Sequence, residues 1–251
     1  MILNSSKIIV FGANGLLGSS VSQAILEAGY ELVAVDYNIS GFLSKIDDKY
    51  HGSIVCETLD ITNEESVHNF FISLDGYVSG AVNCTYPRNE SYGAHFFDVK
   101  LSSFNENLAL HLGSTFLISQ QCAKYFEKNH RLFSLVNISS VYGVIAPRFD
   151  VYHNTKMTMP VEYAATKSAI IHLNKYISSY VGNSKFRVNC VSPGGIFDEQ
   201  PKEFCDAYKK YTNGTGMLDV SEMVGSVIFL LSDASRYVTG QNIIVDDGFV
   251  M

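Results

Sequence analysis

The chain has 251 residues, of which 47% are hydrophobic and 17% charged, a composition typical of a folded globular protein. The formal net charge is −7 and no dense basic cluster occurs, so the sequence argues against a nucleic-acid partner. The five cysteines lie far apart without a Cys-x-x-Cys pair. This spacing favours free thiols in a reducing compartment and predicts neither a disulfide framework nor a metal site.

The beginning of the sequence and its longest apolar runs bear on location. The segment before the apolar residues at 7–11 has no cationic leader and no cleavage site. No run approaches the roughly 20 apolar residues that a membrane span needs. We therefore expect a cytoplasmic protein with no membrane contact.

Short apolar runs alternate with segments of helical periodicity along the whole chain, as in buried parallel strands joined by crossover helices. The runs predict seven strands, at 7–11, 31–35, 53–59, 77–83, 133–138, 186–191 and 242–245. The periodic segments predict helices near 16–29, 63–73, 103–128, 160–182 and 219–232. Gly29 is expected to end the first helix, and Thr62 with Glu65 to form a capping box for the second.

Neither an internal repeat nor a linker marks a domain boundary, so we expect one α/β domain over residues 1–251. A (β/α)₈ barrel also alternates strands and helices, and the segment after the first strand decides between the two folds. That segment reads Phe11-Gly12-Ala-Asn-Gly15-Leu-Leu-Gly18 and leads into a helix. A glycine turn between a strand and a helix is where a dinucleotide pyrophosphate meets backbone N–H groups.

The glycine turn therefore predicts a Rossmann fold, with a doubly wound seven-stranded parallel sheet flanked by helices. The glycines allow a tight turn, close approach of the phosphate, and close packing of helix against strand. The candidate cofactor-binding residues of the turn are Gly12, Asn14, Gly15, Leu17 and Gly18.

Two acidic residues follow later strands. Asp36 ends the second strand, where a carboxylate can accept hydrogen bonds from the adenosine ribose and would repel a 2′-phosphate. Neither the glycine turn nor position 37 carries Arg or Lys, so we expect NAD(H) to be preferred over NADP(H). Asp60 and Ile61 after the third strand could meet the adenine; Asp60 could equally be a helix-terminal residue.

Three further residues suggest a catalytic site. Ser140 follows the fifth strand, and Tyr163 and Lys167 stand four residues apart, on one face of a predicted helix. A nearby ammonium lowers the pKa of a tyrosine, so Tyr163 could act as general base in alcohol oxidation and general acid in carbonyl reduction. Ser140 would hold the substrate oxygen. The hydride chemistry would belong to a nicotinamide cofactor.

In this order, the glycine turn, the strand-end Asp, the Ser pair and Tyr-x-x-x-Lys resemble the short-chain dehydrogenase/reductase family over the whole chain. Asn83, the segment around Pro193 and Gly194, and the late segment Val238-Thr-Gly240 also match its pattern. The resemblance implies that Ser140, Tyr163 and Lys167 are catalytic and that Tyr163 and Lys167 also contact the cofactor. It further implies that Asn83, Pro193, Gly194 and Ile196 lie in the cofactor site and that the chain forms a homodimer or homotetramer.

The sequence departs from the family pattern at two motifs. Its glycine spacing is that of the longer, sugar-nucleotide branch, with Leu16 where the shorter branch has its second glycine. The family's helical Asn, which connects the lysine to solvent through water, aligns with His111, and Asn107 lies one turn earlier. Either His111 or Asn107 could anchor the relay.

The third departure is an insertion at about 144–160, which lengthens the segment between Ser140 and Tyr163 by about ten residues. Its polar residues, with Arg88, could bind a polar substrate, and the candidates are Arg88, Arg148 and Tyr152. The alternative is a tolerated surface insertion. The amino-acid sequence around this insertion resembles that of the flagellin-modification and nonulosonate-pathway oxidoreductases.

These observations predict an NAD(H)-dependent oxidoreductase that interconverts a secondary alcohol and a ketone on a small molecule. A sugar, sugar phosphate or nucleotide sugar of surface glycan biosynthesis is the expected substrate. A 3-oxoacyl or generic ketone reductase and a non-catalytic NAD(H)-sensing regulator remain alternatives.

Overall fold

The computed structural model describes residues 6–153 and 155–251. Its centre is a parallel sheet of seven strands in the order β3-β2-β1-β4-β5-β6-β7. The strands are β1 Lys7–Phe11, β2 Glu31–Asp36, β3 Ile54–Thr58, β4 Val78–Asn83, β5 Phe133–Ile138, β6 Phe186–Pro193 and β7 Asn242–Val245. The direction of winding reverses between β1 and β4, so the predicted doubly wound Rossmann sheet is confirmed.

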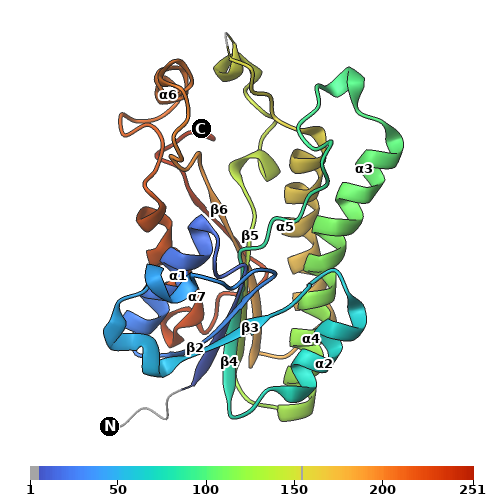
Figure 1. Cartoon of the computed structure of the whole chain (residues 1–251), viewed down its shortest axis with the longest axis vertical. Coiled ribbons are helices and arrows are strands. Elements are labelled where there is room, and N and C mark those ends of the chain that lie inside the picture. Colours follow the sequence, from blue (N-terminus) through green and yellow to red (C-terminus); the bar gives the residue numbers. More distant parts are fainter. Residues whose placement is uncertain (1–5, 154) are drawn as a thin grey trace.

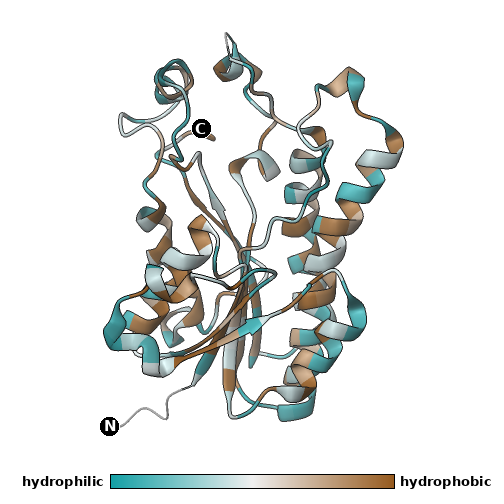
Figure 2. Cartoon of the chain, in the orientation of Figure 1, coloured by the Kyte–Doolittle hydropathy of each residue, from teal (hydrophilic) through white to brown (hydrophobic). Residues whose placement is uncertain are grey.

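Helices cover both faces of the sheet (Figure 1). The helices α1 Leu16–Glu27 and α7 Val224–Leu231 pack on one face, and α2 Glu64–Ser73, α4 Ser114–Asn129 and α5 Val161–Val181 on the other. Apolar side chains of the strands and the inner helix faces form the two core layers. Figure 2 shows the hydrophobic residues of these strands and helices in brown. Because both faces of the strands are buried, their sequences read as continuous apolar runs.

The two remaining helices rise above the carboxyl ends of the strands (Figure 1). They are α3 Leu101–Leu108 and α6 Lys202–Lys209. The sequence analysis missed α6, although Phe204 and Tyr208 are spaced for one helical face and are both buried. The predicted helix at 103–128 is divided, because a π-helical turn, Ala109–Gly113, separates α3 from α4.

Helix ends test two local predictions. Gly29 lies just beyond α1 with a φ of 87°, as expected of a residue that ends a helix. The predicted capping box was wrong, because Asn63 is the N-cap of α2 and accepts a hydrogen bond from the Ser66 amide. Thr62 instead donates its hydroxyl to Asp60. A capping box does occur before α7, formed by Asp219 and Glu222.

Candidate active site

The glycine turn joins β1 to α1 by close backbone packing. Gly12 has a φ of 77°, and its amide donates to the Val35 carbonyl. A Cβ on Gly18 would lie 1.9 Å from the Gly12 oxygen, so only glycine lets α1 approach the turn this closely. Gly15 is the N-cap of α1, and the first amides of this helix, including that of Leu17, have no partner within the helix. Such a helix start is suited to bind phosphate.

Asn14 and Asp36 fasten this turn to the end of β2. The Asn14 amide donates to Asp36 Oδ2 at 2.9 Å, and its side-chain nitrogen donates to the carbonyls of Asn38 and Ser40. The side-chain oxygen of Asn14 is buried and has no hydrogen-bond partner among the described residues. This orphaned acceptor, the free helix start and the strand-end carboxylate fit the phosphate and ribose of a dinucleotide.

The structure brings to the glycine turn a cation that the sequence did not indicate. Lys45, far from the glycine turn in sequence, donates from Nζ to the Asn14 carbonyl oxygen at 2.5 Å. A cation therefore does lie near Asp36. It comes from the loop after β2, where no periodic pattern or motif distinguishes it.

The ends of β3 and β4 hold three further predicted cofactor residues. Asp60 accepts hydrogen bonds from the amide and hydroxyl of Thr62, as a turn residue does, and Ile61 is part of the core. Asn83 is buried beside the glycine turn, and its side-chain oxygen accepts from the amide and hydroxyl of Thr85. The hydrogen bonds of Asp60 and Asn83 therefore stabilise the strand ends.

The end of β6 carries the predicted cofactor residues Pro193, Gly194 and Ile196. Pro193 ends the strand, and the Gly194 amide donates to the Val245 carbonyl. A Cβ on Gly194 would lie 2.8 Å from the Tyr208 hydroxyl. That hydroxyl accepts a hydrogen bond from the Gly195 amide, and Ile196 pairs with Leu218. The predicted residues of this segment thus lie against α6, which the sequence analysis missed.

The end of β5 is held close to α5 by contacts with the Lys167 carbonyl of that helix. Ser139 donates its hydroxyl to the Lys167 carbonyl at 2.8 Å. A Cβ on Gly143 would lie 2.7 Å from that same carbonyl, so glycine is required for the approach. Ser140 is 5% exposed, and its hydroxyl oxygen accepts from the Tyr142 amide. The two elements that carry Ser140 and Lys167 are thereby held in one register.

Lys167 is buried and points its ammonium group back at β5. Its Nζ donates to the Ile138 carbonyl at 2.8 Å and lies 3.4 Å from His111 Nε2 and 5.6 Å from the centre of the Tyr163 ring. Burial lowers the pKa of Lys167 to about 8. Proton exchange by Lys167 is therefore possible near neutral pH.

The pKa of Tyr163 differs from the expectation. Burial raises the pKa of its phenol, and a hydrogen bond with Ser140 opposes the rise. The predicted lowering by the Lys167 ammonium is not found, because the ammonium is directed at the Ile138 carbonyl and His111. Ser140, Tyr163 and Lys167 nevertheless converge at one point, as predicted from their order in the chain.

The structure separates the two relay candidates. His111 lies in the π-helical turn, a feature common at functional sites, and its imidazole reaches Lys167. Burial, reinforced by the Lys167 charge, holds the pKa of His111 well below its ordinary value, so the ring is neutral and can accept from the ammonium. Asn107 instead binds Asn89 through both ends of its amide. The sequence could not distinguish the two, because they lie on one helix face.

Tyr86 was missed and lies in the middle of the site. Its ring contacts those of Tyr163, His111 and Tyr92 edge to face, with centres 5.6, 5.1 and 5.6 Å away. Arg88, a predicted substrate residue, is exposed and lies over the same ring at 5.0 Å. The short-chain dehydrogenase/reductase pattern at Asn83 reads Asn-Asn-Ala-Gly, whereas this chain reads Asn83-Cys-Thr-Tyr86, and the departure at Tyr86 was the available signal. Arg88 is thus close to the predicted catalytic residue Tyr163.

The insertion does not present Arg148 and Tyr152 to the site as expected. Arg148 donates to the carbonyls of Phe249 and Met251 and lies over the Tyr211 ring at 4.4 Å. Tyr152 is 8% exposed and packs on Phe204 of α6. Both side chains therefore hold the insertion against α6 and the C-terminal segment. Met157 and Met159 pack against the aromatic cluster that includes Phe249, as does Tyr163.

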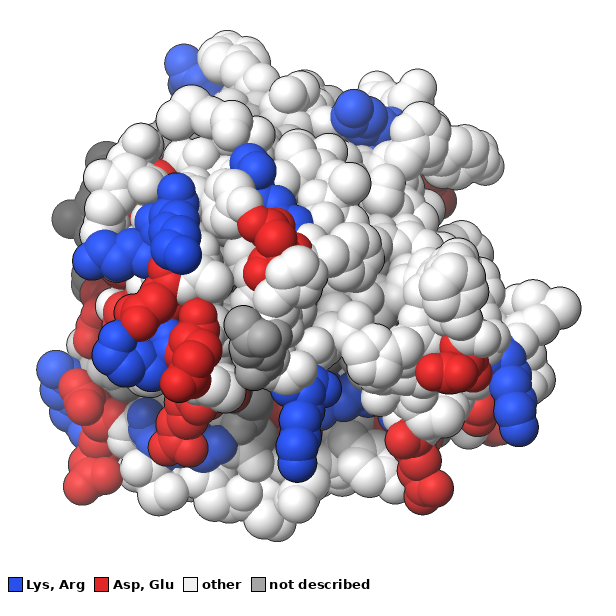
Figure 3. All heavy atoms as spheres, turned by 90° about the horizontal axis from the view of Figure 1, so that it is seen from above, with Lys and Arg blue, Asp and Glu red and all other residues white. Residues whose placement is uncertain are grey.

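The carboxyl edge of the sheet faces the viewer in Figure 3. Basic and acidic residues are interspersed on it, and uncharged residues occupy much of the face. Among residues 6–153 and 155–251, no group of three or more His, Cys, Asp or Glu could hold a metal, and no helix is long and apolar enough to span a membrane.

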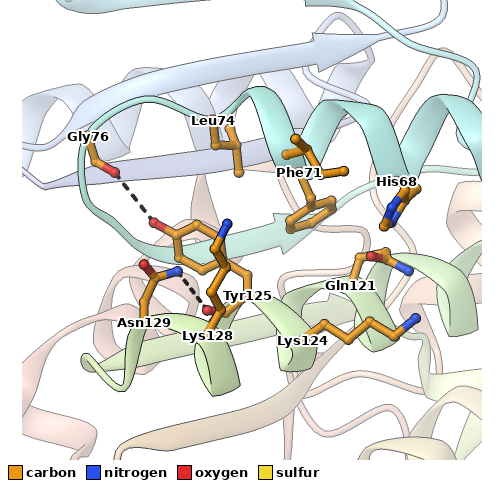
Figure 4. Close-up of a pocket in the computed structure, with 10 residues that line it drawn as sticks. His68, Phe71, Leu74, Gly76, Gln121, Lys124, Tyr125, Lys128 and Asn129 are labelled. Carbon is orange, nitrogen blue, oxygen red and sulfur yellow. Dashed lines mark hydrogen bonds between the residues drawn. The ribbon is translucent and has the colours of Figure 1, made fainter.

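A cavity of about 190 Å³ lies elsewhere, between α2 and α4 (Figure 4). His68 and Phe71 reach it from α2, and Lys124 and Tyr125 from α4. None of the predicted catalytic residues lines it.

Comparisons with known proteins identify similar sequences and structures. A family model described as enoyl-(acyl carrier protein) reductase matches residues 12–250. The post-translational flagellin modification protein A of Campylobacter coli is 33% identical over 259 residues, covering 99% of each chain. The 3-oxoacyl-[acyl-carrier-protein] reductase of Bos taurus is 28% identical over 95% of each chain. A short-chain dehydrogenase structure from Leptospira borgpetersenii with bound NAD⁺ is 31% identical, with a TM-score of 0.87 and coverage of 100% of this chain and 98% of that one.

Proposed function

Because the chain belongs to the short-chain dehydrogenase/reductase family, we propose that it interconverts a secondary alcohol and a ketone on a sugar-like substrate, using NAD(H). The convergence of Ser140, Tyr163 and Lys167 at the end of β5 carries the reaction type. The glycan assignment is supported by the similarity to the Campylobacter coli flagellin modification protein.

The residues of the site act on the substrate oxygen and its proton. A nicotinamide cofactor bound at the glycine turn would supply the hydride chemistry at the carbonyl carbon. Ser140 donates a hydrogen bond to the substrate oxygen, and Tyr163 gives that oxygen its proton during reduction and accepts it during oxidation. Lys167, with a pKa of about 8, supplies positive charge to the site, and His111 links it to a proton relay.

Asp36 supports a preference for NAD(H). Its carboxylate is held at the turn by the Asn14 amide, at the place suited to ribose hydroxyls. A 2′-phosphate there would meet the charge of Asp36, although the ammonium group of Lys45 binds the Asn14 carbonyl nearby. The protein contains no tryptophan, so the fluorescence of a bound reduced nucleotide can be followed directly. Titrations with NADH and with NADPH test the preference. Tighter binding of NADPH would refute it.

A specific observation favours a second candidate substrate class. Met157, Met159 and Tyr163 share one apolar cluster, as suits a 3-oxoacyl or other apolar ketone. Parallel assays with keto-sugars and with 3-oxoacyl thioesters separate the two classes. If the protein turns over only the thioesters, the substrate is a 3-oxoacyl compound and not a sugar.

The catalytic assignment is tested with Tyr163→Phe, which removes one hydroxyl. Turnover of any accepted substrate should fall by roughly 10²–10⁴-fold, the range for loss of general acid–base catalysis, while NADH affinity changes only a few-fold. Tyr237→Phe is the control, because Tyr237 is 85% exposed and lies between α7 and β7 in the chain. Retained turnover in Tyr163→Phe would contradict the mechanism.

We also propose a homodimer or homotetramer, as the family usually forms. The exposed pair Tyr176 and Tyr180, stacked on α5, offers an apolar surface for such contact. Light scattering gives the answer: a monomer would refute this proposal.

A further inference from the structure

Tyr86 lies beside the Lys167 ammonium group and takes no part in the mechanism above. It follows β4 in the chain, and the ammonium nitrogen lies over its ring, 5.8 Å from the ring centre. The centre of the Tyr163 ring is 5.6 Å from the same nitrogen. The two rings meet edge to face with their centres 5.6 Å apart. Two aromatic rings therefore adjoin one buried cation, within the distance at which a ring face attracts positive charge.

Contacts on other sides hold the Tyr86 ring in this position. Its hydroxyl and that of Tyr92 share a hydrogen bond, and the planes of the two rings are perpendicular, at 90°. The His111 ring packs edge to face against Tyr86, with centres 5.1 Å apart. Aromatic pairs of this geometry stabilise a structure beyond the area that they bury. The Tyr86 ring is thus fixed next to the ammonium group.

The other groups that face Lys167 supply no negative charge near neutral pH. Burial lowers the pKa of Lys167 to about 8, and the thiols of Cys190 and Cys84 oppose this lowering. Burial raises the pKa of each of these thiols to about 12, so both are uncharged near pH 8. The imidazole of His111 is neutral, and no ion pair involves Lys167 within residues 6–153 and 155–251. The aromatic rings are therefore important to this cation.

We propose that Tyr86 is a positioning residue whose ring keeps the Lys167 ammonium charged beside Tyr163. The face of a tyrosine ring carries partial negative charge, and its attraction for a cation is greater in a site shielded from water. An aliphatic side chain of similar size would shield the ammonium from water and supply no such attraction. Arg88 lies over the same ring, 5.0 Å from its centre, and stays charged throughout. Loss of the Tyr86 ring should therefore lower the pKa of Lys167.

NMR of protein labelled with ¹³C at lysine Cε measures this pKa, and Lys167→Met identifies the signal. Cofactor-free protein suffices, so the result does not depend on the proposed substrate. Tyr86→Leu should raise the acid dissociation constant of Lys167 by about 2–30-fold, which is the range of one cation–π interaction. Tyr86→Phe keeps the ring and should leave the constant unchanged. Tyr237→Leu is the control at an exposed position and should also leave it unchanged.

A second variant covers the case in which Tyr86→Leu does not fold. Tyr86→pentafluorophenylalanine keeps an aromatic ring of similar size and gives its face positive character, so it should raise the dissociation constant at least as much. Thermal unfolding checks that each variant is folded. An unchanged or lower dissociation constant in the fluorinated protein would overturn the proposal. An equal rise in Tyr86→Phe would also overturn it, because the hydroxyl and not the ring would then be responsible.

The expected effect on catalysis rests on the proposed function. If the charge of Lys167 assists proton transfer, turnover should fall at a lower pH in Tyr86→Leu than in wild type. A changed dissociation constant with an unchanged pH profile of turnover would support the role of Tyr86 and contradict the catalytic role of the Lys167 charge. The two failures are therefore distinguishable.

Discussion

Two consecutive segments lie between β5 and Tyr163, and they differ in how their polar groups are used. At the end of β5, hydrogen bonds from Ser139 and Lys167 hold the backbones of β5 and α5 together. In the insertion, Arg148 and Tyr152 bind α6 and the C-terminal segment instead. Polar residues that are close to a site in sequence therefore indicate a catalytic or binding role only where the fold directs their side chains into that site.

The largest expected effect is at Lys167. Lys167→Met should lower turnover by roughly 10²–10⁴-fold, because the charge that assists proton transfer is lost. The same change should raise the free energy of unfolding by up to about 3 kcal/mol, because a buried ammonium with a lowered pKa is removed. Lys175→Met, exposed on the same helix, is the control.

The pH dependence of that stability gain follows from the sign of the shift. The pKa of Lys167 is about 8 in the folded protein against 10.5 in the unfolded chain. Between these values the unfolded chain binds more protons, so the wild-type protein gains stability as pH rises. The advantage of Lys167→Met should be full below pH 8 and shrink toward pH 10.5. An advantage that is constant across this range would contradict the assigned pKa.

A smaller effect is expected at His111, which acts through Lys167. His111→Leu should lower turnover by about 10–100-fold, the value of one hydrogen bond to a charged group. His111→Asn should recover much of it, and the pH profile of turnover should shift in the leucine variant. Asn107→Ala should leave that profile unchanged, because Asn107 binds Asn89 instead. Equal pH profiles for His111→Leu and wild type would remove His111 from the relay.

The smallest effect on catalysis belongs to Arg148. Arg148→Ala should lower the free energy of unfolding by about 1–3 kcal/mol, because two carbonyls lose their donor. Turnover with a given substrate should change less than in Lys167→Met or His111→Leu. Chemical denaturation measures the free energy of unfolding, and steady-state kinetics measures turnover. A large rise in KM without loss of stability would instead support the original prediction of a substrate residue.

The sequence was informative where a local rule determines the structure. Apolar runs located all seven strands, and the glycine turn selected the fold, because backbone approach at Gly18 admits no side chain. Tyr163 and Lys167 follow from helical spacing. The roles of Arg148 and Lys45 depend on segments distant in the chain, which a local pattern does not record. The same limit applies to the pKa of Tyr163, which burial determines.

We propose that Asp36 and the pair Tyr163 and Lys167 bind opposite ends of one dinucleotide. A crystal structure of the protein with NAD⁺ tests it most directly. We predict the adenosine ribose on Asp36, the pyrophosphate at the start of α1, and the nicotinamide ribose within hydrogen-bond distance of Tyr163 and Lys167. A nucleotide bound elsewhere, such as in the cavity between α2 and α4, would contradict the account.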